Sequence, residues 1–158
     1  MSFSVINNFL HLLATVSWIG GIIFINIVLF PSQTAIEPSQ RGKLFGAVVK
    51  RFTVVVWISV IVLLLTGLYK TPSSMLFNPV SRFGFWLTVK HIAILLMIIN
   101  GILLTFVISP KMRKLSPQPG EQPLTEFIKA QKNIGTIALA NMILGIIILF
   151  CVSMMQFY

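Results

Sequence analysis

Six side chains in this sequence combine metal-binding or cofactor-binding chemistry with an apolar setting. They are His11, Lys90, His91, Cys151, Met154 and Met155. Imidazole nitrogens bind copper, zinc and iron, whereas thiolate and thioether sulfurs suit Cu(I). The lone cysteine excludes an internal disulfide and any Cys-x-x-Cys redox or zinc motif. The residue types therefore predict a metal or cofactor site, whose position depends on the elements that carry them.

The elements that carry these residues are long apolar runs. The chain has 158 residues, of which 56% are hydrophobic and 9% charged, whereas about a quarter of a soluble domain is charged. Runs near 4–30, 52–69, 84–109 and 133–157 can each cross about 30 Å of hydrocarbon. The first has no basic start or cleavage site, so it is not a signal peptide. We expect an all-α integral membrane four-helix bundle, one domain over 1–158, with Pro31 and Pro110 ending the first and third helices.

Basic residues are concentrated in two of the three connections, which predicts the orientation. Only Lys70 and Arg82 lie between the second and third runs. By the positive-inside rule, both basic connections face the cytoplasm and both termini lie outside a cell membrane. The net charge of +9 thus reflects topology, and we expect the lipid bilayer and no nucleic acid as a partner. The two basic connections contain Arg41, Lys43, Lys50, Arg51, Lys111, Arg113, Lys114, Lys129 and Lys132.

Acidic residues are absent from the predicted spans. Glu37, Glu121 and Glu126 all fall in the connections assigned to the cytoplasm. A proton pump that uses a membrane-embedded carboxylate is therefore disfavoured, and Lys90 has no acidic partner at its own depth.

A polar stripe on the first helix predicts where His11 points. At about 100° per residue, its face includes Ser4, Asn7, Asn8, Ala14, Thr15, Trp18, Ile22, Ile25 and Asn26. Lipid offers such side chains no hydrogen-bond partners, so this face should turn toward other helices, with Trp18 as the floor of a cavity. In the alternative, His11 only hydrogen-bonds a neighbouring helix.

Lys90 is predicted to face the interior from the third helix. It shares a face with Trp86, Ala93, Met97, Gly101 and Thr105, whereas His91 points about 100° away. His11 and Lys90 each lie roughly 10–12 Å from the outer end of their helices. We therefore predict a buried cofactor-binding site in the outer half of the membrane, formed by His11, Lys90, Asn7 and Trp18, with His91 in reserve. In the alternative, Lys90 extends outward to the headgroups.

The two halves of the chain can be aligned as an internal repeat of two helical hairpins. An offset of about 80 residues places His11 on His91, Gly21 on Gly101, Pro31 on Pro110 and Gly67 on Gly145. Such a repeat would present the two histidines from opposite sides, as a bis-histidine haem requires. Chance similarity between apolar helices is the alternative.

Near the outer end of the fourth helix, Cys151, Met154 and Met155 follow an i, i+3, i+4 pattern. With His11 and His91 they are the candidate metal ligands, and they could accept Cu(I) at the surface. In the alternative, they are ordinary packing residues.

Three segments carry a resemblance to known membrane proteins: "HLLATVSWIGG", "RFTVVVWISVIVLLLTGLY" and "FWLTVKHIAILL". Together they resemble the copper resistance D (CopD) family and the related HemJ-type protoporphyrinogen oxidases, over the first three helices. The CopD resemblance implies copper uptake or delivery, with a periplasmic or extracellular copper protein as partner. The HemJ resemblance implies binding of haem b or porphyrin by the residues matching His11 and Lys90.

The preferred hypothesis is a CopD-like membrane protein that handles copper through the outer-half site. One alternative is a haem-b redox protein, for electron transfer or porphyrinogen oxidation, with His11 and either His91 or Lys90 as axial ligands. Another is a non-catalytic accessory subunit of a larger membrane metalloenzyme complex. Copper and haem b both remain open as cofactors. The short connections leave no soluble catalytic domain, so an enzymatic role would require a haem-dependent oxidoreductase within the bundle.

Overall fold

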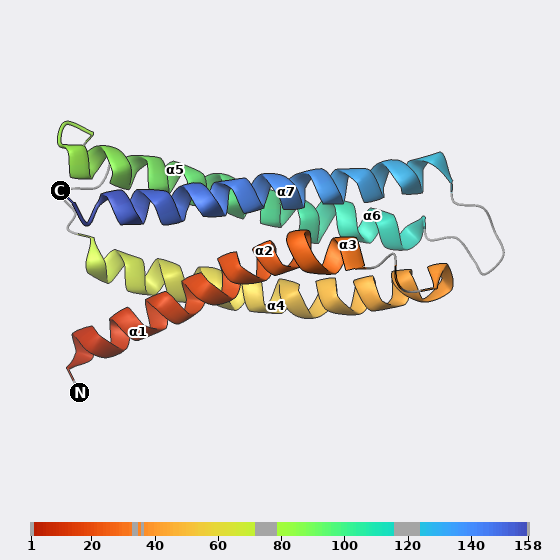
Figure 1. Cartoon of the computed structure of the whole chain (residues 1–158), viewed down its shortest axis with the longest axis horizontal. Coiled ribbons are helices and arrows are strands. Elements are labelled where there is room, and N and C mark those ends of the chain that lie inside the picture. Colours follow the sequence, from red (N-terminus) through yellow and green to blue (C-terminus); the bar gives the residue numbers. More distant parts are fainter. Residues whose placement is uncertain (1, 33–34, 36, 72–78, 116–123, 158) are drawn as a thin grey trace.

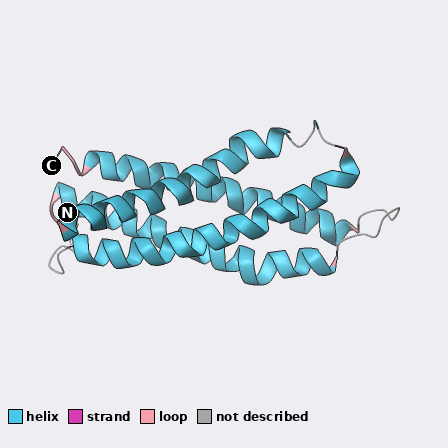
Figure 2. Ribbon diagram, turned by 90° about the horizontal axis from the view of Figure 1, so that it is seen from below, coloured by secondary structure: helices cyan, strands magenta, loops and turns pink. Residues whose placement is uncertain are grey.

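The computed structural model describes residues 2–32, 35, 37–71, 79–115 and 124–157. Over these residues the chain is helical and contains no strand, as Figure 2 shows. Four helices in the described part are long and apolar enough to cross a membrane: Phe3–Ser32, Lys43–Lys70, Arg82–Met112 and Thr125–Met154. The predicted all-α membrane bundle is thus confirmed, and its apolar outer surface implies contact with the lipid bilayer.

The membrane helices differ in how regularly they are wound. The first consists of α1 (Phe3–Thr15), η1 (Val16–Gly20), α2 (Gly21–Phe24), η2 (Ile25–Leu29) and α3 (Phe30–Ser32). The third consists of α5 (Arg82–Ile102), η5 (Leu103–Ile108) and α6 (Ser109–Lys114). The segments named η are π-helical. The second and fourth are the unbroken α-helices α4 (Pro38–Lys70) and α7 (Thr125–Met154).

Helices α4 and α7 begin well before the predicted starts at 52 and 133. The apolar pattern marks only the part of a helix that lies in hydrocarbon. Lysine and glutamine are good helix formers, so the helix continues into the polar residues before each apolar run.

The first membrane helix extends to Ser32, one residue beyond Pro31, which is close to the predicted end. The prediction that Pro110 ends its helix is wrong, because the helix continues through α6 to Lys114. Proline lacks the N–H donor, and its ring clashes with the carbonyl four residues earlier. Pro110 follows the π-helical segment η5, whose wider turn alters the position of that carbonyl, so the chain passes Pro110 without ending the helix.

The helices pack as two pairs (Figure 1). Helix α1 lies along α4, and α5 lies along α7. The pairs meet where η1, α2 and η2 contact α7, around a core of Trp18, Ile19, Ile22, Val60, Ala93, Met97 and Ile148. A Cβ added to Gly145 would lie 3.1 Å from Ile19, so the glycine permits this close approach. The pairing agrees with two hairpins, and the internal repeat itself stays a prediction.

The predicted inward face of the first helix is largely confirmed. Asn7, Ala14, Trp18, Ile22 and Ile25 are buried. The prediction is wrong for Ser4 and Asn8, which are exposed. Figure 1 shows the reason, since the start of α1 diverges from the rest of the bundle. The Asn8 side chain instead accepts a hydrogen bond of 2.6 Å from Nζ of Lys70.

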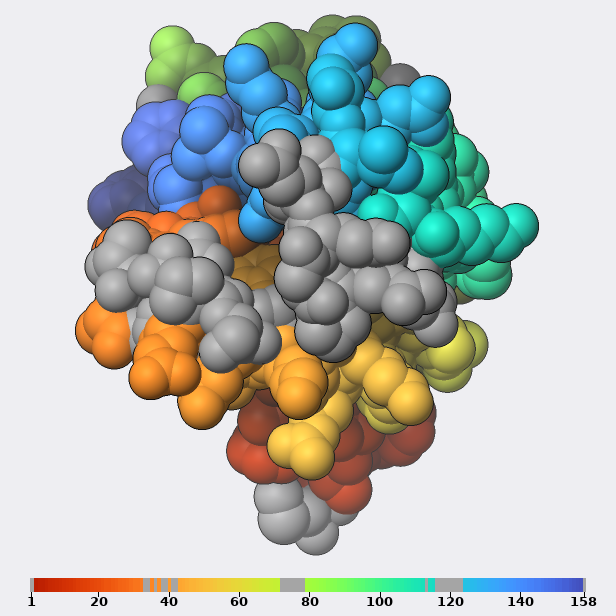
Figure 3. Space-filling view, turned by 90° about the vertical axis from the view of Figure 1, so that its right-hand side faces the viewer, coloured from red at the N-terminus to blue at the C-terminus, as the bar shows by residue number. Residues whose placement is uncertain are grey.

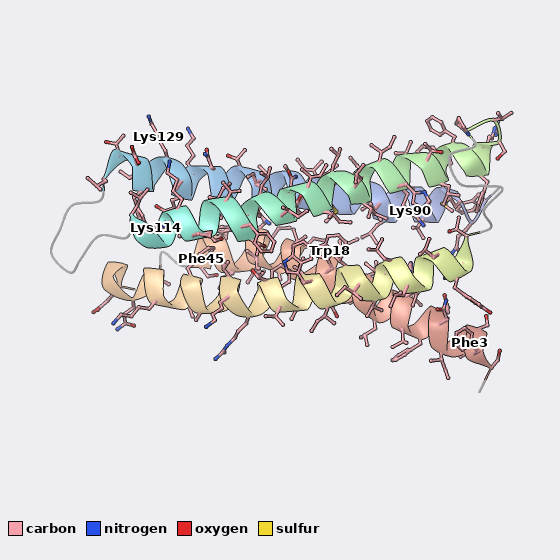
Figure 4. All side chains as sticks on the ribbon, turned by 180° about the vertical axis from the view of Figure 1, so that it is seen from behind. Phe3, Trp18, Phe45, Lys90, Lys114 and Lys129 are labelled. Carbon is pink, nitrogen blue, oxygen red and sulfur yellow. The ribbon has the colours of Figure 1, made fainter. Side chains whose placement is uncertain are left out.

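Both termini lie at one end of the bundle, here called the terminal end (Figure 1). The opposite end, here called the basic end, carries exposed lysines that include Lys43, Lys111, Lys114 and Lys129. In Figure 4, Lys114 and Lys129 lie far from Phe3 and Lys90. The separation of charge predicted from the sequence is therefore present along the length of the bundle.

Candidate functional site

Residues from all four membrane helices enclose a cavity of about 190 Å³, here called the histidine cavity. Its lining includes His11 and Trp18 from the first helix, Gly67 from α4, Lys90 and His91 from α5, and Ile148 from α7. In Figure 4, Lys90 lies in the half of the bundle nearer the terminal end. Four residues that the sequence singled out separately thus line one space, namely His11, Trp18, Lys90 and His91.

The hydrogen bonds around Thr66 determine which nitrogen of His11 carries the proton. Oγ1 of Thr66 lies 2.6 Å from the carbonyl of Val62, to which it donates its only hydrogen. The same Oγ1 lies 2.7 Å from Nδ1 of His11 and must therefore accept from it. The neutral imidazole then carries its hydrogen on Nδ1 and a lone pair on Nε2. No described residue is hydrogen-bonded to that Nε2.

Several further contacts fix the position of His11. Nδ2 of Asn7 donates to the backbone carbonyl of Thr66 across 3.3 Å, which ties α1 to α4 one turn before the histidine. Gly67 is next to Thr66, and a Cβ there would lie 3.7 Å from Cε1 of His11. Asn7 is buried but does not line the cavity. Its hydrogen bond to Thr66 helps to position the imidazole of His11, but Asn7 itself does not contact the cavity.

The histidine cavity has a positive electrostatic environment. Lys90 lines it from α5 and is partly buried. Lys70, at the end of α4, interacts electrostatically with both His11 and Lys90. Of the acidic residues that the structure describes, Glu37 precedes α4 and Glu126 is in the second position of α7 at the basic end. Lys90 therefore has no carboxylate partner among the described residues.

The other candidate metal ligands lie outside this cavity. Cys151 belongs to α7 and is a free thiol with 0% exposure. Met154 and Met155 are partly buried at the end of α7. Among the described residues, no group of three or more His, Cys, Asp or Glu side chains could hold a metal ion. Cys151, Met154 and Met155 remain candidates on sequence alone.

Trp18 separates the histidine cavity from a second cavity. Its side chain is 4% exposed and lines both spaces. The second cavity has a volume of about 110 Å³ and extends toward the basic end, where Phe45 and Ser109 line it. It is here called the asparagine cavity, after Asn26 and Asn141. In Figure 4, Trp18 accordingly lies between Phe45 and Lys90.

Sequence reasoning missed Thr66 as the partner of His11, and it missed the asparagine cavity. Thr66 stands in the apolar run of α4 immediately before Gly67, which was the available signal. A threonine beside a glycine in a membrane helix marks close contact with a neighbouring helix. Which residue it contacts depends on the packing of α1 against α4, which the sequence pattern does not specify.

Comparison with known proteins identifies the family. The family model of copper resistance protein D (CopD) matches residues 46–155. The chain belongs to the CopD family. The match includes Lys90, His91 and Cys151 in the second to fourth membrane helices, whereas the first helix, with His11, lies outside it. No curated protein and no solved structure matched the chain. The resemblance to HemJ-type oxidases is not shown by these comparisons.

Proposed function

We propose that this CopD-family membrane protein takes copper as its substrate into the histidine cavity, for uptake or delivery across the membrane. The observation that carries the proposal is the orientation of His11. Its Nδ1 donates a hydrogen bond to Oγ1 of Thr66, so its Nε2 carries a lone pair that can bind a metal ion. Histidines that bind metals typically donate their other ring N–H to a neighbouring oxygen, because this hydrogen bond fixes the tautomer and the ring orientation.

Lys90 and His91 supply the further nitrogen donors of the proposed site. Both line the same cavity as His11. An ammonium group would repel a copper ion, and no acidic side chain is available there to offset the repulsion. We therefore infer that Lys90 binds copper as the neutral amine and releases a proton when the ion enters. With so few donors, the site would bind copper reversibly, as a transported ion requires.

The dimensions of the cavity favour copper over haem. A cavity of about 150 Å³ in another protein accommodates one benzene molecule. The histidine cavity, at about 190 Å³, is only slightly larger. A porphyrin with four pyrrole rings would require the helices to separate widely, whereas a copper ion with its ligands would not.

Titration of the purified protein tests the proposal. In mild detergent and under reducing conditions, Cu(I) is titrated in competition with a chromogenic chelator. We expect about one copper ion per chain, with binding lost in His11→Ala and retained in Ser4→Ala, an exposed position two turns away on the same helix. No copper binding by the wild-type chain would contradict the proposal. A Soret band that disappears in His11→Ala would instead establish the haem alternative.

A further inference from the structure

The asparagine cavity contains polar groups without protein partners in the described part of the chain. Asn141 is buried, with 6% of its surface exposed. Its Oδ1 accepts a hydrogen bond of 2.8 Å from Asn100, and its Nδ2 donates to no described residue. Both hydrogens on Nδ2 of Asn26 are directed at the carbonyls of Ile22 and Ala138, which leaves its Oδ1 as an acceptor. Polar groups inside a protein usually have a partner, and these two line a cavity in which water or a bound molecule can supply one.

Thr105 supplies a further donor to the same space. In α-helical parts of the bundle, the hydroxyls of Thr15, Thr53 and Thr66 donate to the carbonyl four residues earlier. Thr105 lies in the π-helical segment η5 and makes no such bond. Its Oγ1 instead accepts from Nε1 of Trp57 at 3.4 Å. The hydroxyl hydrogen of Thr105 is therefore available to a molecule in the cavity.

The π-helical segments of the described chain all meet at this cavity. Trp18 comes from η1, Asn26 from η2 and Thr105 from η5, and all three line it. Extra-wide turns of this kind occur frequently at functional sites, where they redirect side chains. Their convergence on one space distinguishes it from a packing defect.

The remaining lining defines the chemistry of the ligand. Trp18, Phe30, Phe45 and Phe52 contribute aromatic surface, and no charged side chain lines the cavity in the described residues. At about 110 Å³ the cavity is smaller than the cavity of about 150 Å³ that holds one benzene molecule, but it is partly open, so a six-membered ring would fill it and extend through the opening. The donors of Asn141 and Thr105 suit carbonyl oxygens, and Oδ1 of Asn26 suits a hydroxyl.

We propose that the asparagine cavity binds the ring of a quinone or quinol. This site is independent of the proposed copper site, from which Trp18 separates it. Donors at Asn141 and Thr105 would bind either redox form of the ring, and Asn26 would accept from the hydroxyl of the quinol. Figure 3 looks onto the basic end, where the start of α7, in blue, lies across from the orange part of α4.

Quenching of tryptophan fluorescence tests the proposal. Trp18 lines the cavity and Trp57 donates a hydrogen bond to Thr105 in its wall, whereas Trp86 lines neither cavity and makes edge-to-face contacts with Phe85 and Phe150. In a Trp86→Phe background in detergent, a ubiquinone with one isoprene unit is titrated. We expect saturable quenching. Thr105→Val, which keeps the side-chain shape, should weaken binding about three- to tenfold because one hydrogen bond is lost.

A pair of glycine variants separates specific binding from partition into detergent. Gly101 lines the cavity, and a Cβ there meets nothing within 4 Å, so we expect the side chain of Gly101→Leu to occupy part of the space. Gly20 is equally unhindered but exposed on the outer surface. We expect at least a tenfold loss of affinity in Gly101→Leu and none in Gly20→Leu.

Two outcomes would overturn the quinone site. One is quenching that does not saturate, and the other is equal quenching in both glycine variants. Two controls verify that the fold is intact. Each variant should elute as a single monodisperse peak, and Gly101→Leu should retain Cu(I) binding. Because copper is measured separately, failure of one site does not imply failure of the other.

Discussion

The imidazole of His11 donates a hydrogen bond from Nδ1 to Oγ1 of Thr66 across 2.7 Å. This contact joins the first membrane helix to α4 at the wall of the histidine cavity. It also determines the tautomer, because the hydroxyl hydrogen of Thr66 is directed to Val62. The copper affinity of His11 should therefore depend on a residue that does not touch the metal.

Replacement of Thr66 by valine tests this dependence. Thr66→Val keeps the branched shape and removes the acceptor, so we expect copper affinity to fall about 10- to 100-fold. Thr66→Ser restores the hydroxyl and should recover most of the affinity. Thr88→Val is the matched control, since Thr88 also donates to the carbonyl four residues earlier but lines neither cavity. Chelator competition measures all four proteins, and equal affinities throughout would exclude a positioning role for Thr66.

The pH dependence of copper binding tests the state of Lys90. At pH above about 7, histidine is mostly neutral and lysine is ordinarily protonated. If Lys90 binds as the amine, each copper ion displaces a proton, and affinity rises with pH by up to about tenfold per unit. Lys90→Met should flatten this slope between roughly pH 7 and 8. Lys50→Met, at an exposed site on α4, should leave the slope unchanged. A wild-type slope near zero is the result that contradicts the release of a proton by Lys90 when copper binds.

Two adjacent glycines in the first helix should respond in opposite directions to alanine. A Cβ on Gly21 would collide with the ring of Phe52, whereas a Cβ on Gly20 meets nothing within 4 Å. Overpacking typically costs about 1–3 kcal/mol, so we expect Gly21→Ala to destabilise the protein by that amount. Gly20→Ala should be neutral or stabilise it by up to about 1 kcal/mol.

Thermal unfolding in detergent measures both glycine variants. Gly21→Ala combined with Phe52→Leu should recover part of the lost stability, because the smaller side chain relieves the collision. If Gly21→Ala melts at the same temperature as the wild type, α2 and α4 are not packed as closely as described.

The orientation of the bundle can be tested by cysteine labelling in intact cells. Cys151 has 0% exposure, so it should remain unlabelled, and Cys151→Ser provides a background without thiols. In that background, a membrane-impermeant maleimide should label Ser2→Cys, at the terminal end, before lysis. It should label Lys129→Cys, at the basic end, only after lysis. The reverse pattern would invert the topology that the positive-inside rule predicts.

Helix number and the inward direction of the main side chains could be predicted from the sequence, because both follow from local patterns. Apolar runs mark the spans, and periodicity on the first and third helices placed Trp18, Lys90 and Met97 toward the interior. The approximate depth shared by His11 and Lys90 followed from the helical rise alone. These features require no knowledge of which helices are neighbours.

The features that could not be predicted depend on contacts between helices or on local winding. The hydrogen-bond partner of His11 depends on how α1 packs on α4. His91 lines the cavity, although helical periodicity predicted that it points about 100° away from Lys90. The π-helical segments leave no signature in apolar periodicity, and η5 explains why Pro110 failed as a helix end. The first helix, which carries His11, also lies outside the family match.

The π-helical segment Val16–Gly20 has a consequence for how this helix tolerates insertions and deletions. A π turn accommodates one residue more than an α turn, so it behaves as a single-residue insertion absorbed within a continuous helix. Deleting one residue there would restore regular winding and keep the residues beyond it on nearly their present faces, because the wide turn accommodates the extra residue. Deleting one residue between His11 and Thr15, where the winding is α-helical, would instead rotate Asn26 and Pro31 by about 100° relative to His11. The relative orientation of the two ends of the first helix thus tolerates a deletion in the π-helical segment and is lost by the same deletion one turn earlier.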